Sequence, residues 1–400
     1  MKKILMIISV LLVLGLSVFG IYQLLKPKNI VLACIEQEKA LYTDLIALYE
    51  AENSALKVNL LVLQEEEYGQ PELWKSKKID VLALPGSFRI KDFSEKEIFS
   101  DLAKISKGEE YLLRAAEDEK IYALTLNGSI PLLLSDKQIL EQQGLIAPSS
   151  FSEFRDVSLV LGAFGYMPFV LEQESEQILK VRALLDNVLL NGLEGRAALL
   201  DEQGELNPAV YSLETLAYIS ELSSAVKTEE ISASGGLLSY GSAGSVPMLI
   251  LGSADIGMQE IDKERYDLAV FPGSALSSFV GMESGQRIAI PKSSGNMEGA
   301  KRFAKFLLSS SAQKVLYEET GLIPAHRFVE VKGELQGVYE YLTKGDVLKV
   351  SFFEGLSSEE EQVLIREVSR MFLKSYTDGE SLSGNIINAL QDQVTVGVQQ

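Results

Sequence analysis

Residues that could do covalent chemistry are scarce in this sequence. Its 400 residues include one histidine, His326, and one cysteine, Cys34. Hydroxyl and thiol nucleophiles usually need a histidine base beside them, and the common zinc sites need clustered cysteines and histidines. His326 lies in a loop after a predicted helix, where we expect a surface side chain. The sequence therefore predicts no catalytic residue, no metal site and no cofactor, and we expect that the protein is not an enzyme.

The balance of charged residues argues against a nucleic-acid partner. Asp and Glu number 56 against 37 Lys and Arg, which gives a net charge of −19. Because so acidic a surface repels phosphate backbones, we expect no nucleic-acid partner. With so many acids a chance pair of carboxylates carries little weight, so counting leaves a glycosidase pair open. The Gly-rich stretch 235–245 lacks the Gly-Lys-Ser/Thr of a phosphate-binding loop, and no dinucleotide fingerprint is present.

The N-terminus predicts the compartment. Residues 4–25 form an uncharged apolar run, flanked by the basic residues Lys2, Lys3, Lys26 and Lys28. The run exceeds the about 7–15 residues of a signal-peptide core and matches the about 20 residues of a membrane span. We therefore expect a retained anchor, although small residues around 18–20 keep a cleaved signal peptide as the alternative. Either reading places the body of the protein outside the cytoplasm.

Cys34 has two interpretations. Residues 31–34 look like a lipoprotein cleavage box, which should directly follow the apolar run. Residues 26–29 intervene, however, and 30–35 has the pattern of a buried strand. We therefore expect Cys34 to be a small core residue.

Hydrophobic patterning predicts alternating strands and helices along the chain. A strand at 30–35, a helix at 40–52 and strands at 57–63 and 79–84 give the βαβ rhythm of an α/β domain with a parallel sheet. Further strands are expected at 121–126, 132–134, 247–251, 268–271 and 287–290. Further helices are expected at 136–144, from 151, at 176–200, 211–225, 296–307 and 312–320, and from a Ser358–Glu361 capping box onward.

Four segments between residues 240 and 327 follow one another in a specific order. They are 244–253, 266–273, 279–281 with 287–290, and 296–325. The last is the most specific, and its matching residues are Asn296, Ala300, Phe303, Leu307, Ala312, Gln313, Gly321, Pro324 and Ala325. Weaker matches precede these segments at 30–62, 80–81, 120–124 and 140–154. The order resembles the bacterial extracellular solute-binding proteins of the sugar-binding type, the family 1 group that includes maltose-binding protein.

The resemblance implies an α/β, two-lobed periplasmic-binding-protein-like fold with crossing hinge strands. A signal peptide or membrane anchor would occupy 1–29, lobe one 30–125 plus 270–320, and lobe two 130–265 plus 325–400. The chain would cross between the lobes near 124–129, 266–271 and 321–327. A ligand would bind between the lobes, and hinge closure would bury it.

The resemblance also implies a function. The protein would be a monomer in the periplasm or at the cell surface, where it captures a small solute, by family a carbohydrate. Its partners would be that solute, the permease subunits of an ABC importer and, through the N-terminal segment, the membrane. The alternative is a sensor or docking protein of the same fold that is anchored at the membrane and has no transport role.

Loops at the carboxyl ends of strands are where ligands bind in such sheets. On that basis the expected ligand-binding residues are Glu36, Gln37, Glu38, Gly86, Ser87, Arg89, Asn127, Ser129, Phe164, Tyr166, Tyr240, Ala254 and Asp255. One departure from the family concerns the sugar-stacking aromatic, whose position falls on Ala254. Phe164, Tyr166 or Tyr240 would then have to supply a ring for stacking.

Overall fold

The computed structural model describes residues 28–53, 56–86, 88–94, 98–113, 120–169, 246–256, 261–272, 280–345 and 347–372. The apolar run at 4–25 and the helices expected at 176–200 and 211–225 lie outside the described residues. Within the described segments, no helix has both the length and the hydropathy that a bilayer crossing requires.

Five strands form the sheet of lobe 1, in the order β2-β1-β3-β10-β4. Their bounds are β1 Lys28–Cys34, β2 Leu56–Val62, β3 Val81–Leu84, β4 Leu124–Thr125 and β10 Arg287–Ala289. β1 runs parallel to β2 and β3, because α2 (Lys39–Glu52) and α3 (Pro71–Ser76) carry the chain back between them. The predicted βαβ start is therefore confirmed, and β10 enters antiparallel between β3 and β4.

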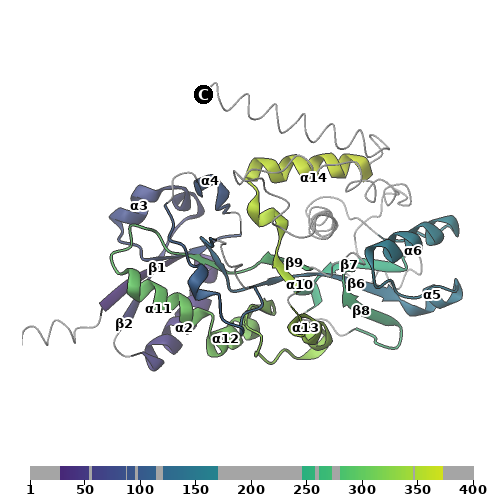
Figure 1. The fold of residues 1–400 in the computed structure, drawn as a ribbon, viewed down its shortest axis with the longest axis horizontal. Coiled ribbons are helices and arrows are strands. Elements are labelled where there is room, and N and C mark those ends of the chain that lie inside the picture. Colours follow the sequence, from purple (N-terminus) through teal and green to yellow (C-terminus); the bar gives the residue numbers. More distant parts are fainter. Residues whose placement is uncertain are drawn as a thin grey trace, which may run out of the picture.

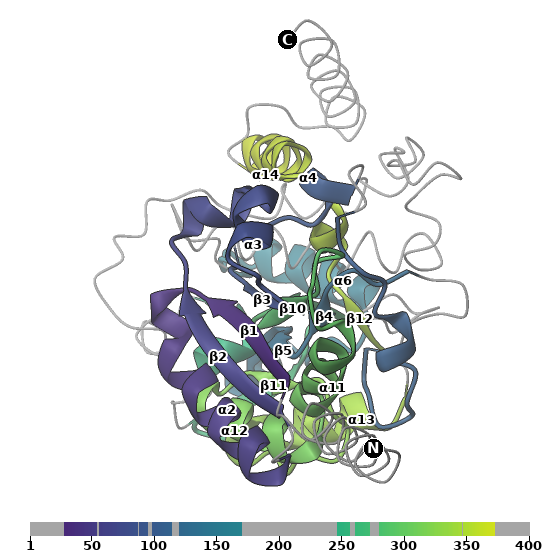
Figure 2. The same cartoon turned by 90° about the vertical axis from the view of Figure 1, so that its left-hand side faces the viewer.

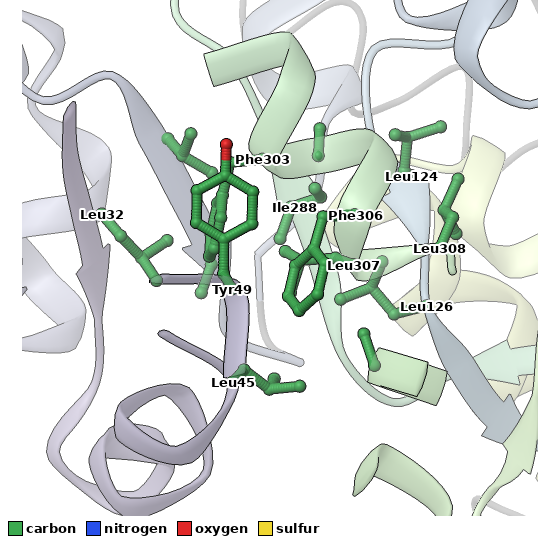
Figure 3. Packing of buried hydrophobic residues seen from close by; sticks show 14 of the residues in the cluster. Leu32, Leu45, Tyr49, Leu124, Leu126, Ile288, Phe303, Phe306, Leu307 and Leu308 are labelled. Carbon is green, nitrogen blue, oxygen red and sulfur yellow. The ribbon is translucent and has the colours of Figure 1, made fainter. Parts of the chain in front are cut away.

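A hydrophobic core cluster of lobe 1 lies between α2, α11 (Met297–Leu307) and this sheet (Figure 3). Another cluster gathers around Trp74, Phe88 and Phe99. The ring of Tyr49 packs against the rings of Phe303 and Phe306, with centroids 5.1 and 4.9 Å apart. The predicted helix start is confirmed, since the Asn296 side chain accepts a hydrogen bond from the Gly299 amide at 3.1 Å. The helix expected at 312–320 is confirmed as α12 (Ser310–Thr320), which ends at Gly321 in the left-handed conformation.

A three-stranded antiparallel sheet forms lobe 2, in the order β7-β6-β8. Its elements are β6 Pro131–Asp136, β7 Met248–Gly252, β8 Tyr266–Val270, α5 Lys137–Gln142 and α6 Phe151–Ala163. The two lobes lie side by side along the longest axis of the molecule, with lobe 1 on the left in Figure 1. The crossing expected near 266–271 is wrong, because β8 pairs along its length with β6 inside lobe 2.

A four-stranded sheet joins the lobes, in the order β11-β5-β9-β12. Its strands are β5 Asn127–Ser129, β9 Val280–Ser284, β11 Ile323–Pro324 and β12 Leu348–Val350. β5 and β11 lie within the crossings expected near 124–129 and 321–327. β9 is the third connection, in place of the segment expected near 266–271. Val280 and Met282 of β9, which fall in the range expected for lobe one, pack in the hydrophobic cluster of lobe 2.

The C-terminal part of the described chain returns from lobe 2 to lobe 1. It comprises η7 (Phe352–Gly355) and α14 (Ser358–Phe372), and α14 lies next to α4 (Lys91–Ser94) in both views (Figures 1 and 2). The expected capping box is wrong. The Ser358 hydroxyl donates to Asp92 Oδ2 at 3.0 Å, and the Glu361 carboxylate pairs with Arg89.

Candidate functional site

The strands β1 and β3 end at the same edge of the lobe 1 sheet, because they are parallel neighbours. Two predicted groups of ligand residues follow them there. The short helix η1 (Glu36–Glu38) directly follows β1, and Gly86 and Arg89 lie in the turn after β3. The side chain of Glu36 is exposed and pairs with Lys39 at 3.0 Å. We use the name crevice for the place that the resemblance assigns to the solute, at this edge of the lobe 1 sheet.

Glu38 is the most perturbed carboxyl at this edge. Burial raises its pKa to about 7, against the lowering influence of the Gln286 side chain and the Arg287 guanidinium. Its Oε2 atom is buried and has no hydrogen-bond partner among the described residues. A group with that pKa is largely protonated below neutral pH, so Glu38 can both donate and accept a hydrogen bond.

Two tyrosines that the sequence analysis missed lie beside Glu38. Tyr42 of α2 and Tyr68 of η2 (Glu65–Gly69) are fully buried, and neither hydroxyl has a partner within the described part of the chain. Burial raises both tyrosine pKa values, and their charged forms interact with Glu38 and Cys34. A buried polar atom without a partner needs a water or a ligand hydroxyl. The available signal was Tyr42 four residues after Glu38, one helical turn away.

The raised pKa of Glu38 predicts that the protein loses stability as the pH rises. Between the ordinary value of 4.5 and about 7, folded Glu38 holds a proton that the unfolded chain has released. Its contribution is therefore complete below the lower value and lost as the pH rises through the upper one. We expect the free energy of unfolding to fall by about 1–3 kcal/mol between about pH 5 and pH 8, measured by urea titration.

Two variants separate Glu38 from its neighbours. Glu38→Gln should abolish this pH dependence, because the amide does not titrate. Glu36→Gln, which alters an exposed side chain of the same short helix, should retain it. An unchanged pH slope in Glu38→Gln would assign the effect to another group.

Arg89 was expected among the ligand-binding residues, but it donates hydrogen bonds within the protein. Its Nε donates to Glu361 Oε2 at 2.9 Å and its Nη1 to the Gly86 carbonyl oxygen at 2.7 Å. The side chains of Arg89 and Glu361 are only 11% and 10% exposed, so solvent screens the pair weakly. The pair links the turn after β3 to α14 and thus lobe 1 to the segment that arrives from lobe 2.

The structure brings Ser129, Ala254 and Asp255 together at the joining sheet. Ser129 Oγ accepts a hydrogen bond from the Ala254 amide at 3.3 Å and lies 3.4 Å from the buried Ser253 hydroxyl. Asp255 Oδ2 accepts from the Gly252 amide at 2.8 Å and closes the turn into the short helix α10 (Ser253–Ile256). Ala254 and Asp255 are exposed, so this turn presents polar backbone and a carboxylate.

Asn127 has a structural role in the hinge. It is fully buried, its Nδ2 donates to Thr320 Oγ1 at 3.1 Å and its Oδ1 accepts from the Gln286 amide at 2.8 Å. The side chain therefore ties β5 to α12 and to the turn between β9 and β10. A ligand amide or hydroxyl would have to displace one of these bonds.

Two of the three predicted aromatic residues lie at or just after the end of α6. Phe164 is 62% exposed at the end of α6, and the Tyr166 hydroxyl accepts a hydrogen bond from Gln143 next to α5 at 3.3 Å. Ser87 and Tyr240 lie outside the described residues. The described residues therefore place neither predicted ring in contact with Ser129 or Ala254.

Cys34 and His326 are both interior residues. Cys34 is buried, as predicted, and burial raises its pKa to about 12. The expectation of a surface His326 is wrong, since the side chain is 7% exposed and burial lowers its pKa. Its amide donates to Gln313 Oε1 at 3.2 Å, which draws the loop against α12. No cluster of three metal-ligating side chains occurs among the residues that the structure describes.

Most of the sequence matches a known protein family. The model of the bacterial extracellular solute-binding proteins matches residues 35–330, well over half of the chain. The chain belongs to this family. Its body therefore lies outside the cytoplasm. No match was found among curated proteins.

Solved structures of similar fold support the two-lobed arrangement of this solute-binding protein. A family 1 extracellular solute-binding protein from Bifidobacterium longum subsp. infantis has a TM-score of 0.72 at 14% identity, covering 92% of this chain and 100% of that one. The solute receptor AcbH, described as exclusively preferring β-D-galactopyranose, has 0.70 at 12%, covering 92% and 99%. Apo RafE from Streptococcus pneumoniae has 0.66 at 17%, covering 90% and 97%. At these identities the likeness establishes the fold alone.

Proposed function

We propose that this solute-binding protein captures a carbohydrate in the crevice and delivers it, chemically unchanged, to the permease subunits of an ABC importer. We propose the expected division into lobes, 30–125 plus 270–320 and 130–265 plus 325–400, with two changes: β9 packs with lobe 2, and α14 contacts lobe 1. The apolar run at 4–25 would tether the body to the membrane. Among structures of this fold, AcbH is described as preferring β-D-galactopyranose, which favours a sugar here.

The observation that supports a neutral solute is that the guanidinium of Arg89 already donates hydrogen bonds within the protein. An anionic solute needs an open cation, and the described crevice edge offers Arg89 already bonded to Glu361 and to the Gly86 carbonyl. The expected site residues supply hydroxyl and carboxyl groups, including Ser129 and Glu38, and a pKa of about 7 leaves Glu38 partly protonated at neutral pH. A neutral solute with many hydroxyls matches such groups, since each hydroxyl donates one hydrogen bond and accepts two.

Calorimetric titration of the full-length protein in a mild detergent tests the solute class. The panel should contain neutral mono- and oligosaccharides, amino acids and dicarboxylates. We expect saturable binding of at least one neutral saccharide and recovery of that saccharide unchanged after prolonged incubation. Saturable binding of only charged solutes would overturn the carbohydrate proposal, and a chemically altered saccharide would overturn the assignment as a binding protein.

Two matched double variants test whether the saccharide binds in the crevice. Glu36→Ala/Gln37→Ala removes two exposed polar side chains of η1 and should weaken saccharide binding about tenfold, or about 1.4 kcal/mol. Glu318→Ala/Gln336→Ala removes the same side-chain types from exposed positions on other helices and should leave binding unchanged. Equal effects of the two pairs would show that the solute binds elsewhere.

A further inference from the structure

Two cavities lie on lobe 1, away from the crevice. One cavity of about 300 Å³ and one of about 490 Å³ share the lining residues Glu110, Tyr111, Arg302 and Lys305. Because they share these residues, the two cavities are adjacent, and we treat them as one surface feature. We call it the basic groove. Its walls come from α11, the start of α12, the end of α2, and η3 (Ala103–Ile105) with the loop after it.

The basic groove lies at the opposite edge of the lobe 1 sheet from the crevice. Glu52 and Asn53 line it at the end of α2, and the Asn53 carbonyl accepts a hydrogen bond from Leu56 at the start of β2. Since β1 and β2 are parallel, their starts lie at the edge away from η1 and Arg89. A ligand in the basic groove would therefore leave the crevice free for the solute.

Positive charge gathers in this groove on a protein of net charge −19. The smaller cavity is lined by four basic side chains and two acidic ones, Lys104, Lys301, Arg302, Lys305, Glu110 and Glu298. Arg302 pairs with Glu298 at 3.3 Å, and both side chains are largely exposed. Within the described part of the chain, no carboxylate forms an ion pair with any of the three lysines. Two other lysines of lobe 1 do form ion pairs, Lys57 with Glu50 and Lys77 with Glu67.

The larger cavity adds hydrogen-bond donors and an aromatic floor. Tyr49, Phe306, Tyr111 and His326 line it, and all four are buried. His326 Nδ1 accepts a hydrogen bond from the Phe328 amide at 3.1 Å, which leaves Nε2 as the protonated nitrogen of the neutral ring. Ser309 and Ser310 line the same cavity at the start of α12, where the helix dipole favours an anion.

We propose that the basic groove is a second binding site, for a ligand that carries a phosphate group. A phosphate monoester holds about −1.5 to −2 charges at neutral pH, and its several acceptor oxygens can meet several cations at once. Three unpaired ammonium groups and a guanidinium suit such a dianion better than the single charge of one carboxylate. The aromatic floor next to the cations would accommodate the apolar part of the same ligand.

Two sources could supply this phosphate group, a free phosphorylated solute or the headgroup of a phospholipid. The second source is close by in the chain. The first strand of lobe 1 begins at Lys28, a few residues after the apolar run at 4–25. The Asn29 carbonyl of this strand accepts a hydrogen bond from the Asn296 side chain at 3.3 Å. Asn296 caps α11, the helix that carries Lys301, Arg302 and Lys305. The start of β1, which follows the apolar run in the chain, therefore lies at the same edge of lobe 1 as the groove.

Titration of the full-length protein with inorganic pyrophosphate at low salt tests the site. We expect saturable binding that weakens at least tenfold in Lys301→Glu/Lys305→Glu. Lys314→Glu/Lys332→Glu changes the net charge equally at exposed positions outside the groove and should retain the parent affinity. Saccharide binding should be equal in all three proteins, so a failure here leaves the proposed function standing. No binding of pyrophosphate, or equal loss in both double variants, would overturn the proposal.

Lysine acetylation rates, measured by mass spectrometry, identify the source of the phosphate. Lys301 and Lys305 report on the groove, and Lys314 and Lys332 in the same molecule serve as references. Slower acetylation of the groove lysines with pyrophosphate, and also in phosphatidylglycerol bicelles but not in phosphatidylcholine bicelles, would identify a lipid headgroup. Slowing by pyrophosphate alone would identify a soluble phosphorylated ligand, and slowing by neither would contradict the site.

Discussion

Replacing Arg287 by methionine is expected to lower the free energy of unfolding by about 3–5 kcal/mol, the cost of breaking a buried ion pair. Arg287 is 3% exposed and its Nη1 pairs with Glu354 of η7. Its Nη2 also donates to the carbonyl oxygens of Pro85 and Phe88, at 3.2 and 2.7 Å. Methionine would leave a carboxylate and two carbonyls without this donor, in a position where water reaches them poorly.

Urea unfolding followed by tryptophan fluorescence measures this loss, because the single tryptophan, Trp74, is buried in lobe 1. The double variant Arg287→Met/Glu354→Gln should lose less than the single variant, since no charge remains buried. Arg302→Met removes an arginine whose side chain is 69% exposed and should change stability by less than about 0.5 kcal/mol. A loss below about 1 kcal/mol in Arg287→Met would show that water replaces the pair.

Replacing Phe303 by alanine should have a comparable effect through packing. Phe303 is fully buried between the lobe 1 sheet and Tyr49, and its ring also stacks on Phe306 with centroids 6.1 Å apart. Removing the ring leaves a cavity that the surrounding helices and sheet cannot fill, at a cost of about 3–5 kcal/mol. The expected result is a lower urea midpoint with an unchanged slope.

Two substitutions control for this result. Phe303→Leu retains most of the volume and should lose clearly less than Phe303→Ala. Phe328→Ala removes a ring that is 70% exposed, so its effect should stay within about 0.5 kcal/mol. Equal losses in Phe303→Ala and Phe328→Ala would contradict the packing argument.

Local patterns predicted the βαβ start of lobe 1, because each buried strand there is a short apolar run and each helix has its own spacing and end signals. The helix boundaries at Asn296 and Gly321 were predictable, because a helix cap and a left-handed stop depend on residues only a few positions away. The crossing expected near 266–271 was misplaced because it depends on pairing between strands that are far apart in the chain. A strand such as β8 has the same alternation whether it pairs within a lobe or spans two.

The candidate site was harder to predict, because its contacts join residues far apart in the chain. Glu354 and Glu361 gave no sign in the sequence that they would meet arginines of lobe 1. Their positions within η7 and α14 are those of ordinary surface acids. His326 was misjudged for the same reason, since its burial depends on Tyr111 and Gln313, which lie in other elements.

The position of β10 has a consequence for how the protein is made. β3 and β4 are successive strands of the same sheet, yet they never pair, because β10 lies between them. A chain that leaves the cytoplasm N-terminus first exports β1, β2 and β3 long before β10. Until residue 289 has crossed, β3 keeps an unpaired edge that is open to other strands. Lobe 1 must therefore finish folding late in secretion, and chains arrested before that point are the ones that quality control in the envelope should encounter.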